Sequence, residues 1–281
     1  MDTLTGYQSR LFPYAYNILG TVDDALDAVQ DVVTSYLAAP KKEMDNEIGY
    51  LIRSVINRSI NIKKRAKRVK DSMWLPEPVA TETADSGIRK NEIISYSMMV
   101  LLEHLNPKER AVFILKEAFD YTHEEIANIL DISVENSRKL LNRSRNELKA
   151  VSKEYKPDYS FSPSFLDEYI QIIKNGDIKA LEKKLASDVT FMADGGGKVS
   201  VVRELTTGSI AVRELIVFLY QNYHVNYAFT IKEINHQPAL MYFKDGILTN
   251  CQVFEFSTEN GAIQNIYSIV DPAKLKNIST F

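Results

Sequence analysis

The chain has 281 residues, of which 45% are hydrophobic and 25% charged, and its net charge is -3. This length predicts two or three domains, and the composition excludes a disordered or fibrous protein. No stretch is apolar enough to span a membrane, residues 1–11 do not resemble a signal peptide, and the single Cys251 excludes an internal disulfide, so we expect a soluble, cytoplasmic protein.

Residues 1–70 are predicted to form a domain of three helices. Apolar residues recur at helical spacing over residues 4–19, 23–37 and 48–68. The second segment is acidic, whereas eight basic residues and no acidic residue fall between Leu51 and Lys70. This separation predicts one face for phosphates and another for a basic protein partner. The alternative for the acidic helix is an ordinary solvated face.

Residues 71–90 are predicted to form a linker, because helical periodicity disappears and Pro76 and Pro78 disfavour helix. Periodicity returns over residues 92–105, stops at Asn106-Pro107 and continues to Glu117. Residues 91–156 are therefore predicted to form a second helical domain.

A helix-turn-helix is predicted within this second domain. Thr122 and Glu125 form a capping box that opens one helix, a turn follows at Asp131, and Ser133 caps a second helix that runs to about Lys149. In such units the second helix enters the major groove of DNA. The alternative is a helical hairpin with a basic outer face. The candidate DNA-binding residues are Ser133, Asn136, Arg138, Lys139, Asn142, Arg143 and Arg145.

Residues 157–281 are predicted to form an α+β domain, with helices over 159–185 and 209–223 and a strand over 189–193. Hairpin turns are predicted at Gln237-Pro238, Asp245-Gly246 and Asn260-Gly261.

Catalysis by this C-terminal domain is not expected. Asp194, His224, Tyr227 and His236 offer acid–base chemistry only if they converge on a cavity, and lone polar residues seldom mark an active site. Residues 194–198 lack the first glycine and the Ser or Thr of a phosphate loop. The histidines and cysteine show no metal-ligand spacing. We therefore expect no enzyme activity, no cofactor and no metal.

Two basic helical domains joined by a proline-bearing linker resemble regions two and four of an extracytoplasmic-function (ECF) sigma factor of the sigma-70 family. Residues 24–32 are similar to the core-polymerase-binding helix, 51–65 to the minus-ten helix, 105–113 to the start of region four, and 122–148 to the minus-thirty-five reader. The resemblance implies promoter-specific initiation with core RNA polymerase, bound through its beta-prime clamp and beta flap. It assigns polymerase binding to Asp27, Gln30 and Asp31, and minus-ten binding to Arg53, Asn57, Arg58, Asn61, Lys63, Lys64 and Arg65.

Three later segments resemble signatures of the sigma group with a fused C-terminal SnoaL-like domain, an α+β cone with an interior cavity. Asp271 stands where that group usually has asparagine. The resemblance implies control in cis, with no separate anti-sigma factor required, and leaves room for an unknown small ligand in the cone. We expect the three segments to meet, although the proline segment can also simply stay extended. Their residues are Trp74, Leu75, Pro76, Glu77 and Pro78; Asp194, Gly195, Gly196, Gly197 and Lys198; and Asp271, Pro272, Lys274 and Leu275.

The alternative function is a one-component DNA-binding regulator whose cone senses a small molecule. Such a protein keeps the helix-turn-helix but does not bind core polymerase. The acidic helix over residues 24–31 and the second basic helix argue against it, since neither is needed by a simple repressor.

Overall fold

The computed structural model describes residues 4–39, 46–66, 73–81, 90–151, 163–202 and 204–278. The chain divides into two compact units. Unit 1 contains residues 1–68 and 83–155, and unit 2 contains residues 69–82 and 156–281. The central segment 69–82 thus groups with the C-terminal residues. Among the described residues, no helix has both the length and the apolar character needed to cross a membrane.

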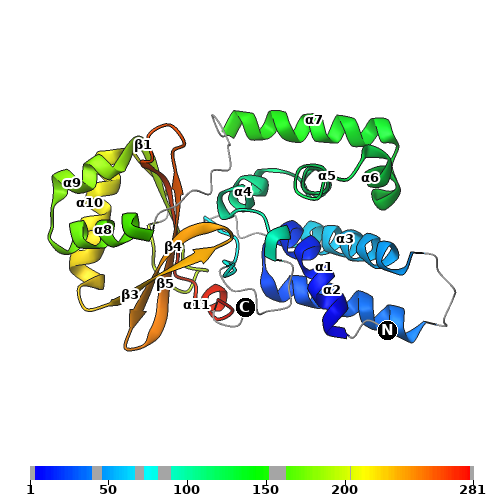
Figure 1. Cartoon of the computed structure of the whole chain (residues 1–281), viewed down its shortest axis with the longest axis horizontal. Coiled ribbons are helices and arrows are strands. Elements are labelled where there is room, and N and C mark those ends of the chain that lie inside the picture. Colours follow the sequence, from blue (N-terminus) through cyan, green and yellow to red (C-terminus); the bar gives the residue numbers. More distant parts are fainter. Residues whose placement is uncertain are drawn as a thin grey trace. The chain divides into compact units, whose positions relative to one another are not determined.

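The first half of unit 1 is a bundle of three helices, α1 (Leu4–Leu19), α2 (Val22–Ala38) and α3 (Glu47–Arg65), which pack on one another (Figure 1). Leu11, Val29, Leu51 and Val55 are fully or almost fully buried, in agreement with the predicted helical spacing. The last two residues of the helix predicted over residues 48–68, residues 67 and 68, lie outside the described part of the chain.

The second half of unit 1 is also helical, but its first part is more broken than predicted. Instead of one helix over residues 92–105 there is a short α-helix with a 3₁₀ turn before and after it, and a longer helix then begins at a capping box formed by Asn106 and Glu109. Helices α1 and α3 contact α5, and α3 contacts α6, so the two halves form one compact unit. The elements are η2 (Lys90–Glu92), α4 (Tyr96–Leu101), η3 (Leu102–His104), α5 (Pro107–Glu117), α6 (His123–Leu130) and α7 (Val134–Val151).

Unit 2 is built on a six-stranded sheet with the strand order β2-β1-β6-β5-β4-β3. Strands β1 and β6 pair in parallel, and the other neighbours are antiparallel. Helices α8, α9 and α10 cover one face, and the short α11 lies on the other (Figure 1). The elements are α8 (Pro163–Lys174), α9 (Ile178–Lys184), β1 (Leu185–Asp194), β2 (Thr206–Thr207), α10 (Ser209–Leu219), η4 (Tyr220–His224), β3 (Ala228–Ile234), β4 (Gln237–Lys244), β5 (Ile247–Phe256), β6 (Ile263–Ile269) and α11 (Pro272–Leu275).

Two predicted hairpin turns can be compared in detail. Asp245 and Gly246 join β4 to β5 with φ values of 51° and 78°, as a two-residue turn with positive φ requires, so this prediction is confirmed. The turn predicted at Gln237-Pro238 is wrong, because Gln237 already begins β4. The turn residues are Asn235 and His236, with φ values of 46° and 60°. Asparagine tolerates this left-handed conformation, and proline is accepted near the first residue of a strand.

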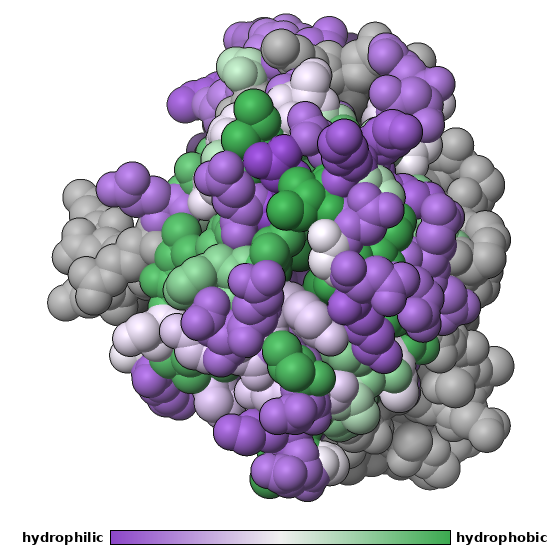
Figure 2. Space-filling view, turned by 90° about the vertical axis from the view of Figure 1, so that its left-hand side faces the viewer, coloured by the Kyte–Doolittle hydropathy of each residue, from purple (hydrophilic) through white to green (hydrophobic). Residues whose placement is uncertain are grey.

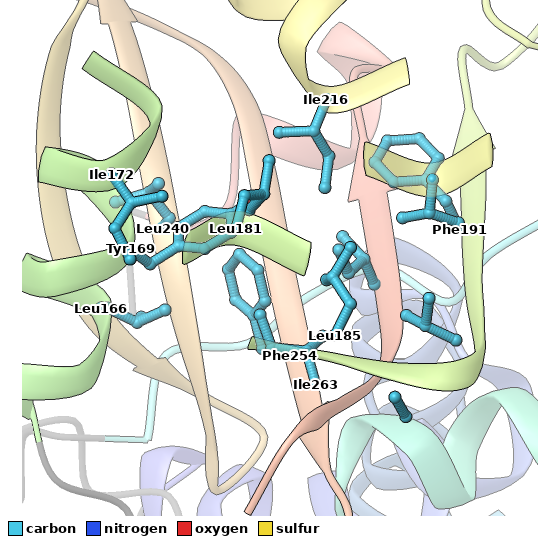
Figure 3. Close-up of a cluster of buried hydrophobic side chains, with 14 of the residues drawn as sticks. Leu166, Tyr169, Ile172, Leu181, Leu185, Phe191, Ile216, Leu240, Phe254 and Ile263 are labelled. Atoms are coloured by element: carbon cyan, nitrogen blue, oxygen red, sulfur yellow. The ribbon is translucent and has the colours of Figure 1, made fainter. Parts of the chain in front are cut away.

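The core of unit 2 lies between the sheet and its three covering helices. Figure 3 shows Tyr169 and Ile172 of α8 beside Leu240 of β4, with Phe254 of β5 close by. Figure 2 looks onto the side of the molecule at the left of Figure 1, where apolar residues interrupt a hydrophilic surface. The exposed apolar residues of α9 and α10 include Ile178, Ile210 and Phe218.

Candidate functional site

The helix-turn-helix is formed by α6 and α7. Thr122 Oγ1 accepts a hydrogen bond from the Glu125 amide at 3.2 Å, and the Glu125 carboxylate accepts one from the Thr122 amide at 2.7 Å, which confirms the capping box. Ser133 accepts a hydrogen bond from the Asn136 amide at the start of α7. Asp131 takes the left-handed conformation (φ 53°) that a glycine more often adopts in this turn. Neighbouring residues thus determine the caps and the turn of the helix-turn-helix.

Ser133, just before α7, and the six other candidate residues on the outer face of α7 are all exposed to solvent. Several of its cations are paired with carboxylates at the surface: Arg138 with Glu124 at 4.0 Å, and Lys139 with Glu135 at 2.7 Å. Exposed pairs of this kind contribute about 0–1 kcal/mol each, so phosphate groups can replace the carboxylates at little cost.

Arg143 differs from its neighbours on α7. Its Nε lies 3.0 Å from a carboxylate oxygen of Glu109, whose side chain is only 1% exposed. Glu109 is also the capping-box residue of α5. Arg143 therefore compensates a buried negative charge inside unit 1, in addition to facing solvent.

Some candidate residues of the basic helix α3 face solvent, and others make contacts inside unit 1. Arg53, Asn61, Lys64 and Arg65 are exposed, and Arg58 forms an exposed ion pair with Asp31 of α2 at 2.5 Å. The candidate cations Lys67, Arg68 and Lys70 of the same basic stretch lie outside the described residues.

Two other candidates on α3 are engaged within the unit. The Lys63 side chain is 6% exposed, and its Nζ donates to the Leu19 carbonyl at 2.8 Å and to Glu103 at 3.0 Å. Asn57 Nδ2 donates to the Ile129 carbonyl of α6 at 2.9 Å. In this structure Lys63 is therefore not part of an exposed basic face. Asn57 is half-buried, because its side chain contacts α6.

A buried ionic cluster joins the two halves of unit 1, and no local sequence pattern indicates it. Arg110 is fully buried, donates from Nε to the Asn17 carbonyl at 2.8 Å and pairs with Glu103. Glu103 thus serves both Arg110 and Lys63. Asn17 also bonds to the Glu92 carbonyl at 2.8 Å. Glu103 therefore links α3 to α5 within unit 1, and removal of one partner from such a buried cluster is expected to be strongly destabilising.

The candidate polymerase-binding residues on α2 lie on its outer face. Asp27, Gln30 and Asp31 are all exposed, while Ala28 and Val29 between them are buried against the bundle. Asp31 is the partner of Arg58 described above. The acidic face is thus available to a protein partner, with one carboxylate shared.

Unit 2 brings the three signature segments together at a site that we call the linker site, made of Trp74, Leu75, Asp194 and Lys274. One oxygen of Asp194 accepts hydrogen bonds from the Leu75 amide at 2.8 Å and from Lys274 Nζ at 2.6 Å. Lys274 also donates to the Leu75 carbonyl. Its ammonium lies 4.3 Å from the centroid of the Trp74 ring. The peptide of Leu75 is therefore held on both sides by a buried ion pair.

Glycine and the capping residue of α11 shape this site. Gly196 donates its amide hydrogen to Asp194 at 2.8 Å and has a φ of 59°. A Cβ on Gly196 would lie 2.2 Å from the Asp271 carboxylate, so only glycine fits there. Asp271 caps α11 by accepting a hydrogen bond from the Ala273 amide at 3.0 Å. Lys198 is exposed and lies outside this network.

The segment that contains Trp74 and Leu75 continues to the edge of the sheet, where residues 79–81 are held. Val79 and Asn235 exchange two hydrogen bonds of 2.9 Å, and the Thr81 amide donates to the Glu233 carbonyl at 3.0 Å. Ala80 forms an antiparallel bridge with Ile234 of β3. Residues 74–81 are therefore attached to unit 2 at both ends.

The four candidate acid–base residues do not converge. His224 lies beside Tyr227, with 5.1 Å between the ring centroids. Asp194 is committed to the linker site, and His236 lies in the β3–β4 turn, where its amide donates to Thr81. Among the described residues no cluster of three or more His, Cys, Asp or Glu side chains is arranged to hold a metal ion.

Comparisons with known proteins agree with this architecture. The family model for sigma-70, region 4 matches residues 96–148, which run from the start of α4 into α7. The probable ECF RNA polymerase sigma factor SigI of Mycobacterium tuberculosis is 24% identical over 276 residues, covering 96% of this chain and 92% of the relative. The ECF RNA polymerase sigma factor SigJ of the same organism is 28% identical over 234 residues, covering 77% and 72%.

The fold of the whole chain is also similar to a solved structure. The crystal structure of Mycobacterium tuberculosis extracytoplasmic function sigma factor SigJ matches with a TM-score of 0.75 at 23% identity, over 94% of both chains. The curated relatives are sigma factors, which initiate transcription and are not enzymes. With helical domains followed by a mixed-sheet domain, the chain is similar over most of its length to ECF sigma factors, and its residues 96–148 match the sigma-70 region 4 family.

Proposed function

We propose that this sigma factor binds core RNA polymerase through the outer face of α2, reads promoter DNA with α3 and α7, and is controlled in cis by its SnoaL-like domain through the linker site. The observation that carries the proposal is the attachment of residues 74–81 to unit 2. We further propose that the protein works in the cytoplasm and needs no separate anti-sigma factor.

The physical basis of the proposed control is the fixed path of the linker. Regions two and four are connected in the chain by residues 71–90, and a free linker would sample many lengths. Attachment at Leu75 and at Val79 holds residues 74–81 in one path, which restricts those lengths. The separation that regions two and four can reach would then depend on whether the linker site is closed.

The contacts inside unit 1 support control of DNA binding by conformation. Asn57 and Lys63 bond to groups of α6, α1 and η3. They become available to a minus-ten strand only if α3 separates from these partners. We propose that promoter binding selects the separated conformation, and that the linker site influences how readily it forms.

Run-off transcription from the upstream region of the protein's own gene, with bacterial core polymerase, tests the sigma function. The full chain would be compared with one that ends at Pro157. Initiation that depends on either form supports the proposal, and the difference between the forms gives the sign of control by the C-terminal domain. If neither form binds core polymerase or starts transcripts, the DNA-binding regulator becomes the better explanation.

Single substitutions test the role of the linker site separately. Trp74→Ala and Lys274→Met should change promoter output or the compactness measured by small-angle scattering, because each removes a contact to the Leu75 segment. Lys198→Met is the matched control, since Lys198 lies in the same signature segment but outside the site. Unchanged transcription together with unchanged scattering in Trp74→Ala would contradict the proposed control through the linker site.

A further inference from the structure

Arg143 stands in the middle of α7, and its charge partner lies inside unit 1. The Nε atom of Arg143 is 3.0 Å from Oε1 of Glu109, whose side chain is 1% exposed. Among the described residues this buried oxygen accepts no hydrogen bond, so the Arg143 cation compensates its charge. The other carboxylate oxygen accepts a hydrogen bond from the Asn106 amide at 3.2 Å, which closes the capping box of α5. Glu109 therefore cannot turn away from Arg143 without opening that cap.

The neighbouring cations of α7 have partners of a different kind. Arg138 and Lys139 pair with the carboxylates described above, and all four side chains are 64–75% exposed. Water can solvate those carboxylates when the cations move to phosphate groups, so the exchange costs little. A buried carboxylate has no such replacement, and the loss of its cation is strongly unfavourable. Arg143 therefore stays with its buried partner.

Two further contacts attach the same part of α7 to α5, which lies beside it (Figure 1). Ser144 is fully buried, and its hydroxyl lies between the Leu140 carbonyl at 2.9 Å and the Glu109 carbonyl at 3.3 Å. Arg145 pairs with Glu117, the last residue of α5, at 2.5 Å. This short stretch of α7 thus contacts both the first turn and the last residue of α5.

The candidate base-reading residues lie on one side of this attachment. Asn136, Arg138 and Lys139 belong to the first two turns of α7, before Arg143. Arg138 precedes Arg143 by about 7.5 Å along the helix axis, so a tilt of about 10° at Arg143 would move the Arg138 backbone by about 1 Å. Binding geometry has to be kept within about 0.5 Å. The attachment to α5 therefore decides whether the first turns of α7 reach base edges.

We infer that Arg143 is a positioning residue, which sets the angle of α7 through Glu109, and that it is not one of the phosphate contacts. The inference rests on the proposed promoter reading by α7 and adds to it a division of roles among the cations of that helix. Glu109 contributes to promoter recognition in this way, although its side chain is too deeply buried to contact DNA.

Holoenzyme assembled from the full chain and bacterial core polymerase tests this role. Fluorescence anisotropy would measure its affinity for the promoter mapped by run-off transcription, and for the same DNA with the minus-thirty-five region scrambled, at several salt concentrations. We expect Arg143→Met to weaken promoter binding by about tenfold and binding to the scrambled DNA hardly at all, with an unchanged salt slope. A lost phosphate contact would weaken both equally and reduce the slope by about 0.9.

A second substitution separates positioning from a general loss of structure. Glu109→Gln keeps a side chain that can close a capping box but removes the buried charge. In the double variant Glu109→Gln/Arg143→Met no buried carboxylate lacks its cation, so we expect the preference for the promoter to recover by about threefold or more. Arg143→Lys keeps a cation and should lose less than Arg143→Met. Lys149→Met, at an exposed position in the last turn of α7, is the matched control.

The ratio of the two affinities is the informative measurement, because a partly unfolded variant binds both DNAs less without a change in their ratio. The inference is overturned if Arg143→Met lowers the salt slope, if it leaves the ratio unchanged, or if Glu109→Gln restores none of the preference. A lack of promoter preference in the unchanged holoenzyme would contradict promoter reading by α7 itself, and with it this role of Arg143.

Discussion

Ion pairs occur in two very different settings in this protein. Along α7 the paired side chains of Arg138, Lys139 and their carboxylates are 64–75% exposed. At the linker site, Lys274 and Asp194 are 9% and 2% exposed, and in unit 1 Arg110 and Glu103 are 0% and 11% exposed. Exposed pairs exchange partners easily, whereas a buried charge that loses its partner has no water to replace it. The same chemistry can therefore serve binding at the surface and fix a conformation in the interior.

The largest loss of stability is expected from a substitution of Glu103. Glu103→Ala removes the carboxylate that the buried Arg110 and Lys63 side chains share. We expect the free energy of unfolding of unit 1 to fall by about 3–5 kcal/mol, toward the upper end of that range. Urea unfolding followed by far-ultraviolet circular dichroism measures it. Glu135→Ala, which removes an exposed partner, should change little, and equal effects of the two variants would contradict the distinction.

The second test concerns the linker site. Asp194→Ala strands the Lys274 ammonium and leaves the Leu75 amide without its acceptor, so we expect a loss of about 3–5 kcal/mol in unit 2. Trp74 is the only tryptophan in the chain and lies over that ammonium, so its fluorescence reports the change directly. Asp188→Ala, at an exposed position, serves as the control. An unaltered midpoint and spectrum in Asp194→Ala would mean that the buried pair does not hold the linker.

A smaller effect is expected from the half-buried His224, which has no ionic partner in the described part of the chain. Burial lowers the pKa of His224 from its ordinary 6.5 to about 4. Between these pH values the unfolded chain binds the proton more readily than the folded one, so stability falls as pH falls through this window. His224→Gln should flatten this dependence in urea titrations of Trp74 fluorescence at several pH values. The same slope in both proteins would show that His224 does not cause it.

The smallest effect on stability is expected on α7. Arg138→Ala removes an exposed pair and should change the free energy of unfolding by less than about 0.5 kcal/mol. Promoter binding by the holoenzyme should nevertheless weaken by about 1–3 kcal/mol if Arg138 reads a base. Fluorescence anisotropy with labelled promoter DNA measures this, with Lys149→Ala in the last turn of α7 as the control. Equal affinity for both variants would remove Arg138 from the proposed interface.

Features determined by neighbouring residues could be predicted from the sequence. The capping box of Thr122 and Glu125 and the turn at Asp245-Gly246 each depend on a few consecutive residues, and both are confirmed. The turn near Gln237 was misplaced by two residues, because Asn235 and His236 adopt positive φ without a glycine to indicate it.

Contacts between residues far apart in the chain were harder to predict from the sequence. The pairing of Glu103 with Lys63 and Arg110 has no local pattern, and the basic run around Lys63 instead suggested a wholly exposed face. The meeting of Trp74, Asp194 and Lys274 was expected from a family resemblance and not from spacing. The partners of Arg143 and Asn57 likewise depend on how helices pack, which a single sequence does not specify.

The linker site joins residues that are made at very different times. Leu75 and Lys274 are 199 positions apart. A ribosome adds about 5–20 residues per second, so the ammonium that holds Leu75 is synthesised about 10–40 s after it. During that interval the nascent chain completes both sigma regions, while the contact that attaches their linker to the C-terminal domain does not yet exist. Newly made molecules therefore pass through a stage in which Leu75 lacks the Lys274 contact, and a chain that ends before Lys274 remains in it.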